Sequence, residues 1–200
     1  MYLLAACSGT FFWHETNRRE DRWGGAALRE RARFGAELVK AIRAEVGDMP
    51  IMFRYSQWKQ QDYTARLAET PEELSQFLLP LSEAGVDIFH CSQRRFWEPE
   101  FEGSDLNLAG WTRKITGKPA ITVGSVGLNA DFIPVPGEVT FREAEPASLD
   151  ELERRLSDNE FDLVAVGRAL ISNPSWVDMI RDDRPDDIKP FRKEHLGQLV

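Results

Sequence analysis

Apolar side chains recur every three to four residues in five segments of the chain, and short, mostly apolar runs lie between those segments. The spacing predicts helices over 26–46, 70–85, 106–115, 148–156 and 173–180. The apolar runs predict buried strands over 50–56, 86–92, 120–124 and 161–168. Strands that are apolar on both faces are typical of parallel sheets flanked by helices. The alternation therefore predicts an α/β fold of four parallel strands joined by right-handed crossovers.

We expect a single domain over residues 1–200, because no Pro-, Gly- or Ser-rich linker divides the chain. An irregular insertion is expected at 129–147, where Pro134, Pro136 and Gly137 interrupt any regular element. Residues 183–200 are charged and contain prolines, which predicts a C-terminal tail outside the helix-and-strand repeat.

Composition narrows the possible classes of function. The 200 residues are 42% hydrophobic and 10% aromatic, which is enough to bury a core. The net charge is −8 and the pI is near 5.0, so we do not expect nucleic-acid binding, which needs a dense basic surface. The three histidines are scattered and no Cys-x-x-Cys pair occurs, so no metal site is predicted.

The sequence shows no signal for export or for membrane insertion. Two cysteines, Cys7 and Cys91, are too few for a disulfide framework and fit a reducing compartment. Leu4-Ala5-Ala6-Cys7 resembles a lipoprotein cleavage box, but a signal peptide needs about 15–30 residues with a charged start. No apolar run approaches the ~20 residues of a membrane helix. We therefore expect a cytoplasmic protein without a membrane partner.

The carboxyl ends of the predicted strands carry the candidate chemistry, because active sites of parallel α/β proteins gather there. Glycine at a strand end lets a ligand approach the backbone, and an arginine fork matches a phosphate. The ends hold Arg54-Tyr55-Ser56, His90-Cys91-Ser92, Gly124-Ser125 and Gly167-Arg168. The last two predict an anion site. The alternative is that the glycines mark simple turns and that Arg168 pairs with a surface acid.

Arg54 is a charge inside an apolar strand, Ile51-Met52-Phe53-Arg54-Tyr55-Ser56. A buried arginine is rarely left unpaired. We expect its side chain either to meet a buried carboxylate or to face a ligand, and the sequence favours neither.

Several segments occur in an order that is known from one protein family. The first is Thr16-Asn17-Arg18-Arg19-x-Asp21-Arg22-Trp23-Gly24-Gly25, followed by a helix that carries Arg31-x-Arg33-Phe34. Arg54, Thr122-Val123-Gly124-Ser125 and Val166-Gly167-Arg168-Ala169-Leu170 come later. From Tyr2 to about Arg181 the chain thus resembles the Old Yellow Enzyme family of FMN-dependent NADH:flavin oxidoreductases.

The resemblance implies the C-terminal half of a TIM (β/α)8 barrel, with the four predicted strands as strands five to eight. It implies FMN as cofactor, NAD(P)H as reductant and a small-molecule substrate, with hydride passing through the flavin to an activated alkene or a similar acceptor. In the family's pattern Arg54 lies beside the flavin ring, and Tyr2 is the catalytic proton donor to the substrate. The FMN phosphate would be held by Gly124, Ser125, Gly167 and Arg168.

The chain departs from the family at its start. The His pair, or His and Asn, that binds the substrate carbonyl should stand just before Tyr2, where only Met1 is present. A complete barrel takes about 250 residues. We therefore expect a truncated chain with exposed sheet edges that binds FMN weakly or not at all on its own. Such a chain is expected to associate with itself or with a missing N-terminal half.

Two other interpretations stay open. The chain is a non-catalytic half-barrel remnant, or a subunit that needs a partner chain. Alternatively, it belongs to a different phosphate-binding barrel, such as an aldolase-like lyase. A lyase needs a Schiff-base lysine or a metal cluster at a strand end, and none of the four predicted ends supplies one.

Overall fold

The computed structural model describes residues 2–4, 9–59, 62, 64–132 and 142–197. The strands of this part of the chain form one parallel sheet. They are β1 (Tyr2–Leu4), β2 (Ile51–Ser56), β3 (Ile88–Ser92), β4 (Ala120–Val123) and β5 (Leu163–Val164). Each strand pairs with the next one in sequence, and the order never reverses. That order is the winding of a barrel and not of a doubly wound sheet, which has a switch point.

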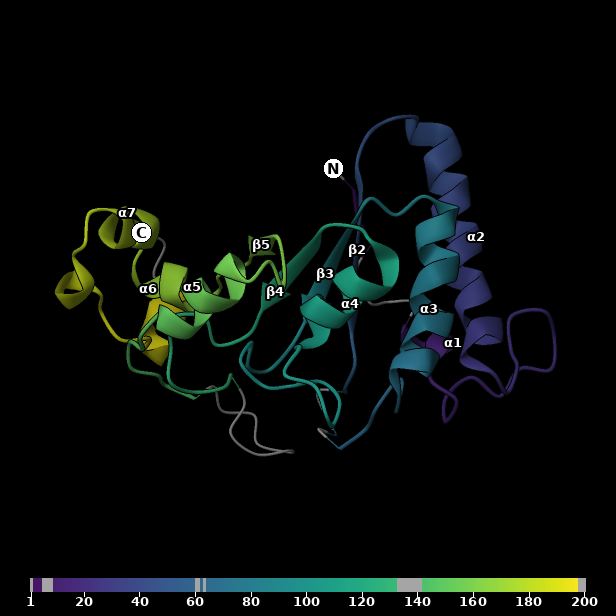
Figure 1. Ribbon diagram of the computed structural model, residues 1–200, viewed down its shortest axis with the longest axis horizontal. Coiled ribbons are helices and arrows are strands. Elements are labelled where there is room, and N and C mark those ends of the chain that lie inside the picture. The colour runs from purple at the N-terminus through teal and green to yellow at the C-terminus, as the bar shows by residue number, and fades with distance from the viewer. Residues whose placement is uncertain (1, 5–8, 60–61, 63, 133–141, 198–200) are drawn as a thin grey trace.

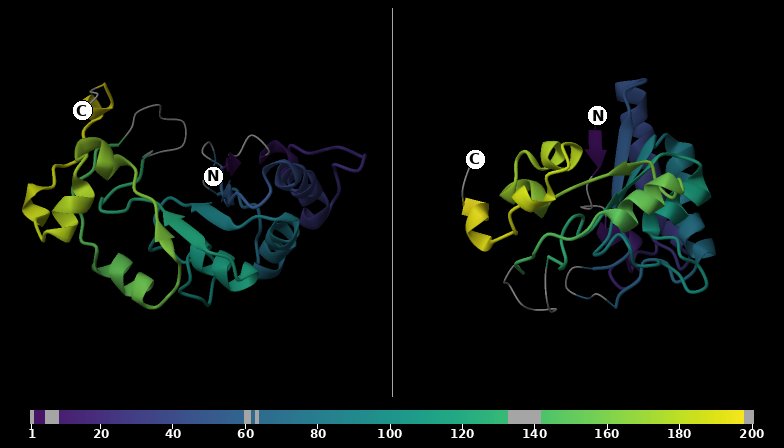
Figure 2. Two further views of the ribbon diagram at one scale, coloured as in Figure 1. Left: turned by 90° about the horizontal axis from the view of Figure 1, so that it is seen from above. Right: turned by 60° about the vertical axis from the view of Figure 1, so that its left-hand side comes forward.

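Helices cover one face of this sheet. Figure 1 shows α2 and α3 side by side at one end, and the view from above in Figure 2 shows the sheet as an arc with α2 to α5 on its convex side. The helices are α1 (Gly9–Phe12), α2 (Leu28–Val46), α3 (Pro71–Ala84), α4 (Leu108–Thr116), α5 (Asp150–Ser157), α6 (Arg168–Ser172) and α7 (Trp176–Arg181), with 3-10 helices at Pro185–Asp187 and Lys193–Gly197. No described helix covers the concave side. The sheet is therefore an open part of a barrel, as predicted.

The core lies between the sheet and the outer helices. Phe53 and Tyr55 of β2 contact Phe77 of α3, with ring centroids 6.2 and 5.5 Å apart. The Tyr55 hydroxyl lies 2.6 Å from Thr112 Oγ1, which the Cys91 thiol also contacts. Because strand residues alternate between faces, Tyr55 and Cys91 point into the helix layer, although both stand at predicted strand ends. The residues next to Tyr55 and Cys91 in each strand face the concave side of the sheet.

The number and the length of the strands differ from the prediction. β1 was not predicted, because three residues are too few to give a periodic signal. β5 is much shorter than the predicted strand over 161–168: its ladder with β4 ends where the Ala165 amide donates to the Thr122 carbonyl at 2.8 Å. The backbone then turns at Gly167, at φ −109° and ψ −98°.

Asn173 does not cap the last helix, which corrects the prediction for 173–180. It ends α6, and α7 begins only at Trp176. The buried Asn173 amide donates to the Lys189 carbonyl at 2.9 Å and accepts from the Lys189 amide at 2.8 Å. An Asn-Pro pair gives the same sequence signal before a helix and in a turn, and here the side chain ties the turn to the tail.

The segment Thr16–Gly25, which carries the family resemblance, is fixed by hydrogen bonds from side chains to backbone carbonyls. The Asn17 amide donates to the carbonyls of Phe11 and Trp23, at 2.6 and 2.8 Å. The buried Arg31 of α2 donates to the Phe12 carbonyl at 2.7 Å and to the carbonyls of Gly25 and Ala26. A Cβ atom on Gly24 would overlap the Arg19 carbonyl oxygen at 1.8 Å. These residues fix the chain between α1 and α2.

The expected insertion and the expected tail contact one another. Leu128 pairs with Pro146 in an antiparallel bridge that joins the two sides of residues 133–141, which lie outside the described residues. Ala144 pairs with Phe191 of the tail in a second antiparallel bridge. Phe191 is fully buried. Within the described residues, no helix combines the length and the apolar character needed to cross a bilayer.

Candidate functional site

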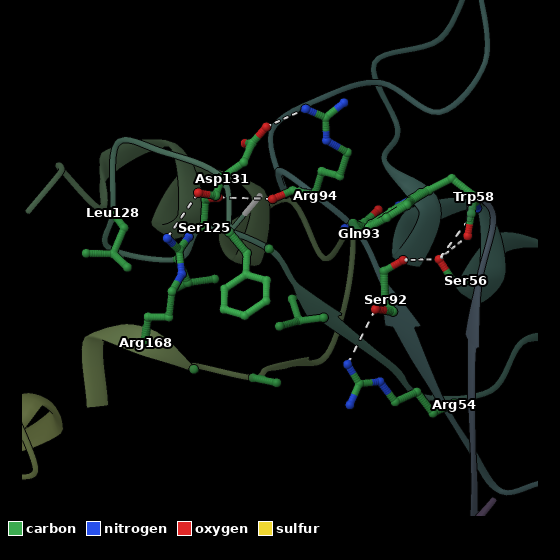
Figure 3. A pocket seen from close by; sticks show the side chains of 16 residues that line it. Arg54, Ser56, Trp58, Ser92, Gln93, Arg94, Ser125, Leu128, Asp131 and Arg168 are labelled. Carbon is green, nitrogen blue, oxygen red and sulfur yellow. Dashed lines mark hydrogen bonds and ion pairs between the residues drawn. The ribbon is translucent and has the colours of Figure 1, made fainter. Parts of the chain in front are cut away.

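A cavity of about 450 Å³ opens at the carboxyl ends of the strands, on the concave face (Figure 3). This volume falls within the range of cofactor and substrate pockets, about 300–1,000 Å³. The five residues predicted to bind the cofactor all line it: Arg54, Gly124, Ser125, Gly167 and Arg168. The remaining lining residues are Ser56, Trp58, Ser92, Gln93, Arg94, Val123, Val126, Leu128, Asp131, Phe132 and Ala165.

Arg54 faces this cavity. Its Nη2 donates to Ser92 Oγ at 3.4 Å. No carboxylate of the described residues forms a salt bridge with it. Arg54 therefore lines a cavity and has no carboxylate partner in the described part of the chain.

The neighbouring His90 adds no second positive charge beside Arg54. His90 lies beside Arg54 in the sheet register. Burial, and then the charge of Arg54, lower the pKa of His90 to about 4, so the ring is neutral at pH 7. Its Nε2 is buried without a hydrogen-bond partner in the described part of the chain.

The loop after β4 shapes one wall of the cavity. Gly124 has φ +134°, and a Cβ atom there would come within 2.7 Å of the Gln93 carbonyl oxygen. Ser125 has φ +52°, and its hydroxyl contacts the carbonyls of Arg94 and Ala130 at 3.0 and 3.2 Å. Turns in which successive backbone N–H groups point to the same side favour an anion. Among the described residues no acceptor is paired with the backbone N–H of Ser125 or Val126.

Arg168 stands across the cavity from Arg54 (Figure 3). Its guanidinium donates to the carbonyls of Ala130, Asp131 and Arg142, at 2.5, 3.1 and 3.3 Å. These partners are neutral, and no carboxylate in the described part of the chain forms a salt bridge with Arg168. Burial lowers the pKa of Arg168. Next to it, a Cβ atom on Gly167 would meet no atom within 4 Å, which leaves the backbone open to a ligand.

Asp131, Arg94 and Trp58 belong to the cavity but were not predicted. The Asp131 side chain is only 4% exposed and accepts from Arg94 at 2.5 Å and from Arg95 at 2.6 Å. Both arginines lie in the loop after β3. Asp131 lies more than 30 residues from both arginines in sequence, so no short sequence motif predicts these ion pairs. Asp131 also falls in the segment predicted as an irregular insertion.

A second cavity of about 100 Å³ adjoins the first and shares Trp58, Gln93 and Arg94 with it. Glu100 lines it and forms an ion pair with Arg66. Burial raises the pKa of Glu100 to about 7, because the loss of hydration outweighs the attraction of Arg66.

Tyr2, the predicted proton donor, is described only through its backbone. It pairs with Ile51, the first residue of β2, three positions before Arg54. Its catalytic role stays a prediction. In the described residues no three His, Cys, Asp or Glu side chains gather as metal ligands.

Fold and site together define a class: a barrel-type β/α protein with a cavity at the strand ends that is lined by Arg54, Arg168, Gly124 and Gly167. The chain belongs to the NADH:flavin oxidoreductase / NADH oxidase family, whose model matches residues 2–133. The resemblance seen in the sequence is thereby confirmed.

Curated relatives agree with this assignment. The chain is 34% identical over 198 residues to an NADH oxidase of Thermoanaerobacter brockii, covering 94% of this chain and 27% of that protein. It is 26% identical to a bilirubin reductase of Clostridium symbiosum, covering 96% of this chain and 50% of the relative. The chain thus spans between about a quarter and a half of the length of these relatives.

Solved structures show the same fold. Morphinone reductase in complex with tetrahydroNAD superposes with a TM-score of 0.65 at 20% identity, over 94% of this chain and 43% of that one. The old yellow enzyme homologue from Zymomonas mobilis gives a TM-score of 0.67 at 17% identity, over 96% and 47%. At these identities the likeness establishes a partial TIM barrel and nothing about ligands.

Proposed function

We propose that this chain forms the FMN-binding part of an NAD(P)H-dependent oxidoreductase that acts on an activated alkene or a similar small acceptor. One observation carries the proposal: the five residues that the family pattern assigns to FMN line a single cavity. Membership in the family supports the cofactor and the reductant.

The cavity fits a phosphorylated ligand in three respects. Among the described residues Arg168 donates hydrogen bonds to carbonyls and lies near the rings of Phe132 and Phe191, so no described carboxylate in contact with it neutralises its charge. No acceptor among the described residues is paired with the backbone N–H of Ser125 or Val126, and the backbone at Gly167 is open to a ligand. Charged donors and free amides together are the groups that bind phosphate.

Arg54 would act at the other end of the ligand. When bound, FMN supplies the group that carries hydride between NAD(P)H and the acceptor. Arg54 is half-buried and lacks a carboxylate partner in the described residues, so it holds a positive charge where water is partly excluded. Such a charge stabilises negative charge that develops on a neighbouring ring system. Tyr2 would deliver a proton to the acceptor.

A second candidate rests on the share of the relatives that the chain covers. Since the chain spans only 27% and 50% of the two curated relatives, the residues present here are compatible with a half-barrel that gains activity only with a partner chain. In that case the cavity is one wall of a site that a second polypeptide completes.

The visible absorption spectrum of the purified chain, after addition of FMN and desalting, separates the two candidates. The proposal predicts a retained flavin band that NADH or NADPH bleaches under anaerobic conditions. Arg54→Met should lower the retained amount, whereas the exposed Arg181→Met should not. If the wild-type chain retains no flavin, the partner-dependent candidate is the better account.

A further inference from the structure

The guanidinium of Arg168 is held by two kinds of contact. Its Nη1 and Nη2 groups donate to three backbone carbonyls, those of Ala130, Asp131 and Arg142. Its central carbon lies 5.5 Å from the centroid of the Phe191 ring and 5.8 Å from that of the Phe132 ring. A cation within about 6 Å of a ring centroid is attracted by the negative face of the ring. Phe191 is fully buried, whereas Phe132 is 38% exposed, so Phe191 is the fixed ring of the two.

These contacts leave part of the guanidinium available to a ligand. An arginine side chain has five N–H donors, and the three carbonyl bonds use only Nη1 and Nη2. Within the described residues, Nε of Arg168 has no hydrogen-bond acceptor. Arg168 lines the large cavity. The direction in which its remaining donors point therefore depends on the groups that hold the rest of the guanidinium.

Phe191 is fixed in turn by the backbone of the C-terminal segment, residues 189–197. Its amide donates to the Ala144 carbonyl at 2.8 Å, and its carbonyl accepts from the Ala144 amide at 3.2 Å. Two residues earlier, Lys189 exchanges two hydrogen bonds with the side chain of Asn173, which ends α6. Figure 1 shows this segment, in yellow, beside α6. The segment is therefore anchored to the helix whose first residue is Arg168.

A ring suits this position better than a carboxylate would. Burial of the Arg168 charge is unfavourable unless nearby groups compensate for it. A carboxylate would neutralise the charge and compete with an anionic ligand for the same N–H donors. An aromatic ring attracts the cation and leaves its net charge intact. The contact with Phe191 thus orients Arg168 and preserves its capacity to bind an anion.

We propose that Phe191 is a positioning residue for phosphate binding. Its ring holds the Arg168 guanidinium in the orientation in which the remaining N–H donors reach a ligand phosphate in the cavity. The inference rests on the proposed function, because the phosphate is that of FMN. The family match ends at residue 133 and the sequence resemblance ends near Arg181, so neither assigns a function to the C-terminal segment.

The test measures the dissociation constants of FMN and riboflavin for Phe191→Leu, which keeps an apolar side chain but removes the ring. The FMN constant should rise about fivefold, equivalent to about 1 kcal/mol. The riboflavin constant should change less than about twofold, because riboflavin has no phosphate. Phe191→Tyr keeps the ring and should stay near the wild type. Phe191→Met replaces the leucine variant if that variant does not fold.

Two controls separate positioning from a general loss of packing. Phe77→Leu is the same substitution at an equally buried site, on α3. It should lower the thermal midpoint as Phe191→Leu does but leave the FMN constant unchanged. In an Arg168→Met background, Phe191→Leu should have no further effect on the FMN constant, because its effect acts through Arg168. Equal weakening by Phe77→Leu, or equal weakening of both flavins by Phe191→Leu, would overturn the inference.

A measurement without flavin tests the contact itself. Phenylglyoxal modifies arginine side chains, and mass spectrometry gives the rate at each site. Arg168 should react at least about twofold faster in Phe191→Leu than in the wild type, whereas the exposed Arg181 should react equally in both. An unchanged Arg168 rate or an unchanged FMN constant in Phe191→Leu would overturn the inference. A wild-type chain that binds FMN no better than riboflavin would instead contradict the proposed function, and the Arg168 rate would still show whether Phe191 holds this side chain.

Discussion

Gly124 shows how strongly one residue constrains the cavity wall. Its φ of +134° is strained for any residue with a side chain, and a Cβ atom would lie 2.7 Å from the Gln93 carbonyl oxygen. Gly124→Ala should therefore lower the free energy of unfolding by about 3 kcal/mol or more, measured by urea denaturation. Gly103→Ala controls for the conformation alone, because Gly103 has φ +76° with open space around it. It should cost about 1 kcal/mol. Equal losses would contradict the described contact.

Glu100 makes stability depend on pH. Its pKa is raised from an ordinary 4.5 to about 7 by burial, so the folded state keeps a proton that the unfolded chain releases. The stability that this gives is complete below about pH 4.5 and is lost as the pH rises toward 7. Between pH 5 and pH 8 the wild type should lose about 1–3 kcal/mol more than Glu100→Gln. Urea denaturation at both pH values measures the difference.

Glu98→Gln is the control for this pH experiment, because it removes a carboxylate from the same loop at a position that is 44% exposed. Its stability should follow the wild-type pH profile. Parallel profiles for the wild type and Glu100→Gln would show that Glu100 is not buried in the way described.

At the residue scale, the sequence predicted those cavity-lining positions that lie at or near strand ends. Arg54, Gly124, Ser125, Gly167 and Arg168 all follow or end an apolar run, and parallel strands bring such ends together. Tyr55 and Cys91 satisfy the same rule but face the helices, because alternation within the strand decides which face a side chain takes. Asp131 escaped prediction because its partners, Arg94 and Arg95, are distant in sequence.

At the scale of elements, a buried ion pair joins α5 to the start of α4. Arg155 donates to the carbonyls of Trp97 and Asp105, both at 3.0 Å, and pairs with Glu160 at 2.9 Å. Glu160 in turn accepts from the Asn107 amide, at the residue that caps α4. Both charged side chains are nearly inaccessible, at 5% and 7% exposed. The pair therefore holds the loop after β3, which also carries Arg94 of the cavity.

Arg155→Met should destabilise the chain by about 3–5 kcal/mol, because it leaves the Glu160 carboxylate buried and unpaired. Its sequence neighbour Arg154 makes ion pairs with Glu151 and Asp158, but its side chain is 53% exposed. Arg154→Met should cost less than about 1 kcal/mol. The two variants can be compared in one urea titration series. Similar losses of stability in the two variants would show that the buried Arg155–Glu160 pair stabilises the fold no more than the exposed ion pairs of Arg154.

Helical spacing predicted the long elements better than the short ones. The segment 26–46 became α2, and Thr70 caps α3 as its sequence suggests, with its side chain accepting from the Glu73 amide. β1, β5 and α6 hold three, two and five residues, too few for a period to show. The sequence predicted Asn173 as a helix cap, but in the structure its side chain is hydrogen-bonded to the backbone of Lys189.

At the scale of the whole molecule, the strands form an arc with an open concave face (Figure 2). The cavity lined by Arg54 and Arg168 lies at the carboxyl ends of these strands. The family resemblance of the sequence implied this partial barrel, and the structural likeness to morphinone reductase and to the old yellow enzyme homologue from Zymomonas mobilis confirms the fold. The residues that we propose for phosphate binding follow β4 and β5 and all lie in the described part of this chain. We therefore expect measurable FMN binding by this chain alone.

The most direct test is a comparison of FMN with riboflavin, which lacks only the phosphate, by fluorescence titration of the purified chain. FMN should bind saturably, with a dissociation constant at least about tenfold lower than that of riboflavin, equivalent to about 1.4 kcal/mol from the phosphate contacts. Arg168→Met should abolish that difference. Equal affinity for the two flavins, or no saturable binding of FMN, would contradict the assignment of the cavity as an FMN site.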